Sequence, residues 1–436
     1  MNSPDADLAA REHACDLLQF IDASPSPWHV VSNLARRLEG AGYRELQECD
    51  DWVVRPGGRH YVIRGGSSLI AFVAGAAAPA HAGFRLAGAH TDSPGLRLKP
   101  RALIRGGGLL RLGVEVYGGP ILATFSDRDL GLAGRVQVRS GRSFEARLVH
   151  LDQPLARIAN LAIHMNREVN EQGLKLHRQH ELPLLLALDG GAVDDPLDTL
   201  LAQQLGVPAG QIVAWDLMVC DTQPGSLWGA RQEFIAASRI DNLASTHAAL
   251  GALLGVEQPA HTAVAAFFDH EEVGSASSVG AAGSLFEDVL ARVAAALGAH
   301  GSDAARARAR SVFISADMAH AWNPGFPAAY EPQHHLMVNG GPAIKHNVSQ
   351  RYASESASVA RFIGWCEAAG VPFQSYVHRS ELGCGSTIGP LVASRLGIAT
   401  VDVGAPMWAM HSVRESAGVL DSWWMGKALA QALQYG

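Results

Sequence analysis

Two adjacent glutamates, Glu271 and Glu272, follow an apolar run over residues 262–268 and are the residues of this sequence best suited to chemistry. The apolar run predicts a buried strand. Because neighbouring side chains on an extended segment point in opposite directions, the two carboxylates face different surroundings. One can bind a metal ion while the other accepts a proton, as metal-assisted hydrolysis requires. Taken alone, the pair is better interpreted as the solvated end of a loop.

Further candidate ligands stand at the boundaries of other predicted elements: His90, Asp317 and His411 after strands, and Asp241 at the start of a helix. In open α/β sheets, functional residues collect beyond the carboxyl ends of the strands, so these side chains are expected to meet. Each has a structural alternative. Asp241 can cap its helix, His411 can be a core histidine, and Asp317 can end a strand in a turn.

Together with Glu272, these residues supply two imidazoles and three carboxylates. If one carboxylate bridges, each of two divalent ions receives a histidine, a carboxylate of its own and the shared one. Imidazole and carboxylate without thiolate suit zinc, with manganese or cobalt as alternatives. Asp92 shares a face with His90 and is expected to orient that imidazole, although it can also be a turn former before Pro94. Glu271 is then the expected general base.

An α/β framework must position these residues. Predicted helices cover residues 7–21, 28–38, 242–254, 285–297, 355–369 and 420–433, and predicted strands cover 61–63, 69–73, 84–89, 262–268, 312–315 and 398–403. This alternation predicts a mostly parallel or mixed sheet covered by helices. From about residue 99 to 231, short alternating runs between Gly-rich turns predict an antiparallel β unit instead. The sequence therefore predicts a catalytic α/β domain over 1–98 and 232–436, interrupted by a β-rich insertion over 99–231.

Composition narrows the class of protein. The chain has 436 residues, is 48% hydrophobic and carries a net charge of −7, which argues against a nucleic-acid or anionic-membrane partner. It has no apolar run of ~18 residues and no secretory signal at its start, so no membrane partner is expected. The five cysteines are scattered, which fits a reducing compartment and predicts a cytoplasmic enzyme.

Six ordered motifs, spread over nearly the whole chain, resemble those of the aspartyl aminopeptidase family of zinc metallopeptidases: residues 89–94, 221–224, 239–243, 269–275, 315–320 and 409–412. The resemblance implies a ligand assignment in which one ion is held by His90, Asp241 and Asp317, and the other by Asp241, Glu272 and His411. Asp241 is then the bridge, Asp92 orients the histidine, and Glu271 is the general base.

The resemblance further implies substrate contacts at His164, His320, Lys345 and Tyr352. Family members combine a mixed-sheet, three-layer metallopeptidase domain with an inserted β-rich dimerisation domain, and they assemble as tetrahedral dodecamers built from dimers. In such an assembly, a loop like residues 160–164 reaches a neighbouring subunit's active site. His164 would there contact substrate or metal, whereas the sequence alone suggests a structural histidine.

The function implied is that of a metallo-aminopeptidase that hydrolyses the N-terminal residue of peptides with a free N-terminus and prefers Asp or Glu there. A buried Lys345 would pair with such a side chain, and an exposed loop lysine is the alternative. The competing interpretations are a broad-specificity aminopeptidase, a related two-zinc deacylase, and a non-catalytic scaffold that keeps its metals for folding.

Overall fold

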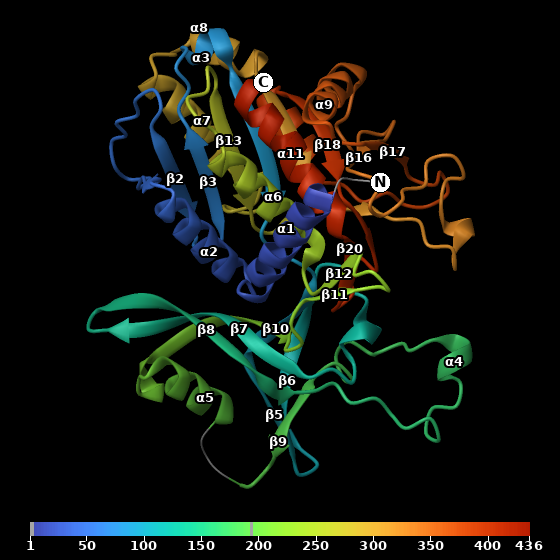
Figure 1. Cartoon of the computed structure of the whole chain (residues 1–436). Helices are drawn as coiled ribbons and strands as arrows, with labels where there is room; N and C mark the ends of the chain where they lie inside the picture. Colours follow the sequence, from blue (N-terminus) through green and yellow to red (C-terminus); the bar gives the residue numbers. More distant parts are fainter. Residues whose placement is uncertain (1–3, 192–194) are drawn as a thin grey trace.

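The computed structural model describes residues 4–191 and 195–436. Figure 1 shows two parts, an α/β body and a smaller β unit beneath it. The colour sequence shows that both ends of the chain belong to the body, while the middle of the chain forms the β unit.

A nine-stranded sheet runs through the body in the order β1-β2-β3-β13-β4-β14-β18-β16-β17. Its strands are β1 (Arg44–Glu45), β2 (Arg59–Arg64), β3 (Ser68–Val73), β4 (Phe84–His90), β13 (Thr262–Phe268), β14 (Val312–Ala316), β16 (Ala343–His346), β17 (Gln374–Val377) and β18 (Ala399–Gly404). The central strands β13, β4, β14 and β18 are parallel neighbours, whereas β3 and β16 flank them in antiparallel orientation. The carboxyl ends of the four parallel strands therefore lie along one edge.

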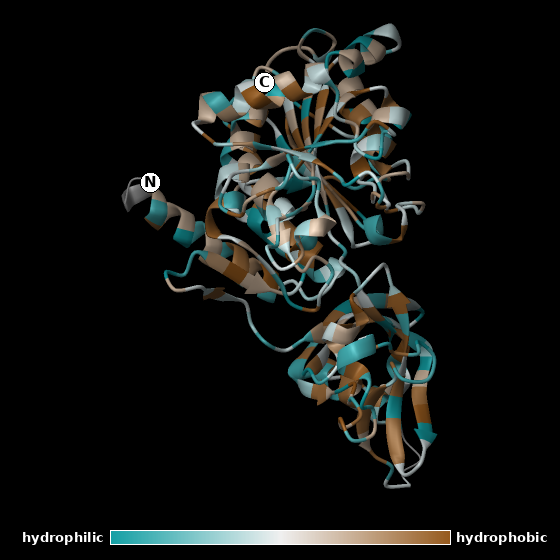
Figure 2. Ribbon diagram, turned by 90° about the vertical axis from the view of Figure 1, so that its right-hand side faces the viewer, coloured by the Kyte–Doolittle hydropathy of each residue, from teal (hydrophilic) through white to brown (hydrophobic). Residues whose placement is uncertain are grey.

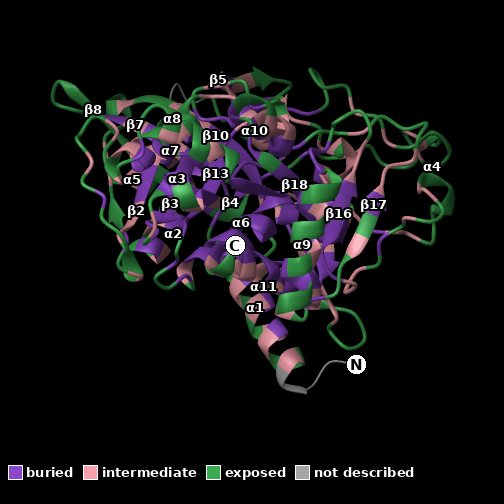
Figure 3. Cartoon of the chain, turned by 90° about the horizontal axis from the view of Figure 1, so that it is seen from above, coloured by how far each residue is buried: buried purple, intermediate pink, exposed green. Residues whose placement is uncertain are grey.

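Helices cover both faces of this sheet. One apolar core packs beneath α1 (Pro4–Asp22), α2 (Pro27–Gly40), α6 (Ile240–Leu254), α9 (Ser356–Ala369) and α11 (Val419–Tyr435). The opposite core packs beneath α3 (Pro79–Ala82), α7 (Leu285–Ala296), α8 (Ser302–Ala309) and α10 (Ile388–Leu396). Every residue of β3, β13 and β14 is buried, because helices cover both faces of these strands, and their sequences are accordingly almost continuously apolar. Figure 3 shows β3 and β13 among the buried strands, in purple, at the centre of the body.

The β unit is a six-stranded antiparallel sheet in the order β8-β7-β10-β5-β6-β9. Its strands are β5 (Gly95–Gly106), β6 (Leu109–Tyr117), β7 (Leu130–Ser140), β8 (Ser143–Ala156), β9 (Leu184–Leu188) and β10 (Ile212–Asp221), and it includes α4 (Val169–Gln172) and α5 (Pro196–Leu205). Its own apolar core includes residues of α5. Figure 2 shows hydrophobic and hydrophilic residues alternating along its strands, as expected where one sheet face is solvated.

A small five-stranded sheet, in the order β11-β12-β20-β19-β15, joins the two parts. It consists of β11 (Ser226–Trp228), β12 (Phe234–Ala237), β15 (Ala319–His320), β19 (Pro406–Trp408) and β20 (Glu415–Gly418). The predicted α/β class with a mixed sheet and a β-rich insertion is confirmed. The boundaries of the insertion stay a prediction. The one between residues 98 and 99 falls inside β5, and the one between 231 and 232 falls between β11 and β12.

None of the helices within residues 4–191 and 195–436 has both the length and the apolar character needed to cross a membrane.

Candidate active site

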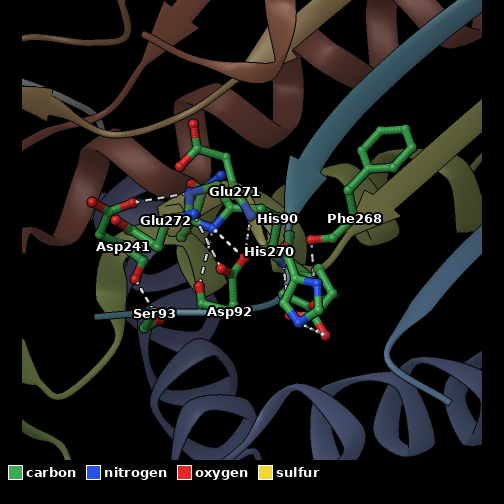
Figure 4. Close-up of polar contacts among 12 residues, drawn as sticks. His90, Asp92, Ser93, Asp241, Phe268, His270, Glu271 and Glu272 are labelled. Atoms are coloured by element: carbon green, nitrogen blue, oxygen red, sulfur yellow. Dashed lines mark hydrogen bonds and ion pairs between the residues drawn. The ribbon is translucent and has the colours of Figure 1, made fainter. Parts of the chain in front are cut away.

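Strand ends at the carboxyl edge of the large sheet bring the predicted ligands together. His90 is the last residue of β4, and Asp317 directly follows β14. Glu271 and Glu272 begin a short 3-10 helix, η3 (Glu271–Val273), just after β13. The parallel pairing of β4 with both β13 and β14 aligns these ends, and His90 lies opposite Phe268 in the register. Figure 4 shows the resulting cluster, with the glutamates and Asp241 around His90.

One half of the cluster is built around His90. Its Nε2 lies 3.5 Å from Asp241 Oδ1 and 3.5 Å from Asp317 Oδ1. Its Nδ1 faces Asp92, 3.0 Å from the backbone oxygen and 3.4 Å from Oδ1. If Nδ1 carries the proton and donates to Asp92, the lone pair of Nε2 points at the space between the two aspartates.

The other half is built around His411, which lies in the turn between β19 and β20. Its Nε2 is 3.4 Å from Asp241 Oδ2 and 3.5 Å from Glu272 Oε1. Its Nδ1 lies 3.0 Å from the carbonyl oxygen of Gly119. That oxygen can only accept, so Nδ1 is the donor and Nε2 is again directed toward carboxylates.

Asp241, in the first turn of α6, links the two halves. Its two oxygens face different histidines, and Oδ1 is buried without a hydrogen-bond partner among the described residues. The donor atoms of His90, Asp241 and Asp317 lie within 4.8 Å of one another, as do those of Asp241, Glu272 and His411. A buried carboxylate oxygen with no donor is costly unless a cation neutralises it. Nitrogen and oxygen donors at this spacing fit zinc.

Asp92 fixes the position of the two glutamates as well as facing His90. It is completely buried, and its Oδ1 and Oδ2 accept the backbone N–H groups of Glu271 and Glu272, both at 3.1 Å. The Tyr117 hydroxyl donates to Oδ2 at 2.7 Å. One carboxylate thus orients a histidine and holds the turn that carries the glutamates.

The electrostatics of the cluster show an excess of negative charge. Burial, only partly offset by His90, combines with the charges of neighbouring aspartates to raise the pKa of Glu271 to about 8. Burial and Asp241 raise the pKa of Glu272 well above its usual range. Although burial opposes it, the carboxylates of Asp241 and Glu272 raise the pKa of His411 to about 10. All three shifts arise because carboxylates outnumber cationic side chains in the cluster, and such a group of charges is suited to binding cations.

A cavity of about 580 Å³ opens beside the cluster, and three of the four predicted substrate contacts line it: His320, Lys345 and Tyr352. Lys345 is buried at 2% exposure, so the alternative of an exposed loop lysine is wrong. Its Nζ lies 3.3 Å from Asp317 Oδ2 and 5.3 Å from the centre of the Tyr352 ring. Burial, followed by the nearby Lys345, lowers the pKa of His320 to about 4, so this imidazole is neutral at neutral pH.

His164 lies elsewhere in the chain. It is exposed in the segment between β8 and α4, at a distance from the cavity of its own subunit. The structure of one subunit therefore brings together every predicted ligand, Glu271, Asp92 and three of the substrate contacts, but leaves His164 apart.

Glu415 belongs to the site but is not among the residues predicted from the sequence. It is buried, and its Oε2 accepts the N–H of Asp241 at 3.0 Å while its Oε1 accepts the N–H of His411 at 2.6 Å. Burial and the charge of Asp241 raise the pKa of Glu415 to about 8. The sequence shows only that this acidic residue comes four positions after the candidate ligand His411. That spacing does not predict its contact with the distant Asp241.

Known proteins are similar to this chain over nearly its whole length. Residues 20–431 match the family described as Aminopeptidase I zinc metalloprotease (M18). The chain is 47% identical over 409 residues to the "Probable M18 family aminopeptidase 2" of Pseudomonas paraeruginosa, covering 93% of this chain and 94% of that protein. A chain of the cryo-EM structure of the Ape4 and Nbr1 complex superposes with a TM-score of 0.95 at 36% identity, covering 99% of this chain and 86% of its own length. The S. cerevisiae mApe1 dodecamer gives a TM-score of 0.84 at 28% identity, covering 96% and 95%.

A mixed α/β body with clustered imidazole and carboxylate donors at its sheet edge defines the class as a metal-dependent hydrolase. The chain belongs to the M18 family of zinc aminopeptidases, and it is therefore a hydrolase that acts as an exopeptidase. This confirms the family predicted from the six motifs and the prediction that the chain is an enzyme.

Proposed function

We propose that the site holds two divalent cations, with zinc as the first expectation and manganese or cobalt as alternatives. His90, Asp241 and Asp317 would hold one, and Asp241, Glu272 and His411 the other. The observation that carries this proposal is Asp241, whose two oxygens lie 3.5 Å and 3.4 Å from the Nε2 atoms of two different histidines. A single ion bound by one of these two groups of ligands would leave the histidine and carboxylate of the other group without an ion.

Such ions, when bound, lower the pKa of water and polarise the peptide carbonyl. Glu271 is placed to act as general base, because it lines the cavity and its backbone is held by Asp92. Its pKa is raised by burial and by negative neighbours, and added positive charge would bring the value back down toward neutrality, where a base works best. In this proposal Glu271 takes a proton from the attacking water and returns it to the leaving amine. Neutral His320 can donate a hydrogen bond to the oxyanion.

Replacing Glu271 tests this assignment. Glu271→Gln keeps the shape of the side chain but cannot accept the proton, so kcat should fall by about 10²–10⁴-fold while bound zinc stays at the wild-type level. The measurement is steady-state turnover of an aminoacyl-aminocoumarin together with metal analysis. Near-normal turnover would make the base assignment wrong.

The substrate proposed is a peptide with a free N-terminus and an acidic first residue. Support comes from Lys345, a buried ammonium in the cavity wall that can pair with a carboxylate. Lys345→Met should lower kcat/KM for Asp and Glu substrates by at least about thirtyfold and leave Leu substrates nearly unchanged. Because Lys345 also contacts Asp317, metal content must be compared in the same samples.

Equal wild-type rates on Asp, Glu and Leu substrates would favour the broad-specificity aminopeptidase. Cleavage of N-acylated substrates but not of free N-termini would favour the deacylase.

The assembly proposed is a homo-oligomer, a tetrahedral dodecamer built from dimers through the β unit of residues 99–231, working in the cytoplasm. Around the exposed His164, the apolar side chains of Leu161, Ile163 and Met165 are 67%, 48% and 75% exposed. Apolar side chains this exposed in one segment indicate a surface covered by another subunit.

Light scattering measures the mass of the assembly in solution. His164→Ala should lower turnover without changing that mass if this residue reaches a neighbour's site.

A further inference from the structure

A short segment of the β unit, residues 117–124, lies against both halves of the candidate metal centre. Tyr117 is the last residue of β6, a strand paired with β5 and β9 within the six-stranded sheet. The segment ends in the short 3-10 helix η1 (Leu122–Phe125). It is thus anchored in the β unit at one end and passes along the ligands of the catalytic body.

The first contact of this segment is with the half built around His90. The Tyr117 hydroxyl donates to Asp92 Oδ2 at 2.7 Å. Asp92 is completely buried and is the residue that faces His90 Nδ1 and accepts the N–H groups of Glu271 and Glu272. A phenol from the β unit therefore helps to hold the carboxylate on which this half depends.

The second set of contacts is with the loop that carries His411. The carbonyl oxygen of Gly119 accepts from His411 Nδ1 at 3.0 Å, and the N–H of Ile121 donates to the His411 carbonyl at 2.9 Å. Thr124 Oγ1 accepts the N–H of Val413 at 2.9 Å. Both the ring and the backbone of this candidate ligand are therefore fixed by the same segment.

The fit is close as well as polar. Gly118 has a φ of +67°, and a Cβ added there would lie 3.2 Å from Glu272 Cβ and 3.3 Å from the Glu272 carbonyl oxygen. The segment thus leaves no spare space beside a candidate ligand.

We propose that residues 117–124 are a positioning element for the metal centre, with Tyr117 and Gly119 fixing the two histidine ligands from within the same subunit. The inference rests on the ligand set proposed above. It gives the β unit a role in metal affinity, in addition to any role in assembly. A purely structural segment would change stability when altered, but not the affinity of the folded protein for zinc.

Tyr117→Phe tests the proposal with the loss of a single hydroxyl. Because residues that orient metal ligands contribute about 10–100-fold to affinity, the dissociation constant for zinc should rise by at least about tenfold, measured by chelator competition on the metal-free, full-length oligomer. With excess zinc, kcat should recover most of its value. The matched control is Tyr61→Phe, which removes a hydroxyl that donates to Glu39 at 2.7 Å in the body, and its zinc affinity should equal that of the wild type.

Gly118→Ala is the second variant. Its added Cβ should displace Glu272 and so raise the dissociation constant for zinc. Its control is Gly141→Ala, with a similar φ of +63° and no atom within 4 Å of the added Cβ, so that backbone strain is matched. If Gly118→Ala fails to fold, the zinc affinity of Tyr117→Phe alone tests whether this segment positions the metal ligands. Wild-type zinc affinity in folded Tyr117→Phe would overturn the inference. Failure of the wild-type protein itself to bind two ions would instead contradict the ligand set.

Discussion

The two halves of the candidate metal centre are built differently. The half around His90 and Asp317 stands on the ends of two packed central strands, and the His90 side chain is 2% exposed. In the half around His411 and Glu272, His411 lies on a turn and Glu272 in the short helix η3, and the His411 side chain is 28% exposed. A buried carboxylate, Asp92, faces the first imidazole, whereas the second depends on a backbone carbonyl of the β unit. The sheet therefore positions most of the first half, which Tyr117 of the β unit supports only through Asp92, whereas His411 in the second half is held directly by the β unit.

This contrast predicts unequal affinities. A site with prearranged, buried ligands loses less freedom when it binds an ion than a site whose ligands lie on a turn. We expect the ion beside His90 to bind more tightly than the ion beside His411.

Asp241→Ala would break the comparison most completely, because this residue serves both halves. Zinc content should fall to nearly zero and turnover to background, measured by metal analysis and peptide hydrolysis. Retention of two ions would show that Asp241 is not shared.

Separate removal of the two histidines would sharpen the comparison. His411→Ala should keep one tightly bound ion, whereas His90→Ala should weaken both, because His90 faces the shared Asp241 from the rigid side. Zinc titration by calorimetry measures the number of ions and their affinities. Identical binding curves for the two variants would mean that the halves are equivalent.

Glu415→Gln should have a smaller effect. An amide has only one oxygen, so either the Asp241 or the His411 N–H loses its acceptor, at a cost of about 1–3 kcal/mol in stability. The melting temperature should drop by a few degrees, and the second ion should bind more weakly. An unchanged melting temperature together with unchanged zinc affinity would show that Glu415 does not position these ligands.

Acid should destabilise the body through His13. This residue of α1 contacts His247 on α6, the helix that carries Asp241. Burial, followed by the nearby His247 on α6, lowers the pKa of His13 to about 3. Because the pKa of His13 is lower in the folded state, folding favours the neutral imidazole. The free energy of unfolding is therefore undiminished above the unfolded pKa of about 6.5 and decreases as the pH falls below that value. By pH 5 the loss is about 2 kcal/mol.

The His13 effect is measured by comparing melting temperatures at pH 7.5 and pH 5. His13→Gln should lose less stability than the wild type over this interval, while the control His300→Gln, at an exposed position, should behave as the wild type. An equal acid shift in His13→Gln and the wild type would remove His13 as the cause.

The features predictable from the sequence were those encoded locally. His90, Glu272 and Asp317 lie at or shortly after the ends of apolar strands, and the rule that parallel strand ends share an edge brings them together. Tyr117, Gly119 and Glu415 were not predictable, because each acts on a partner far away in sequence; Gly119 and His411 are 292 positions apart. Strands of two to four residues, as in the small sheet of β11, β12, β15, β19 and β20, are too short to show a period, so that sheet was missed as well.

The most direct test is anomalous diffraction at the zinc edge from crystals of the zinc-loaded protein. Two peaks should appear, one on each side of the Asp241 carboxylate, with the peak near His90 the more fully occupied. No peak beside Asp241, or a single ion contacting both histidines, would contradict the shared-carboxylate centre.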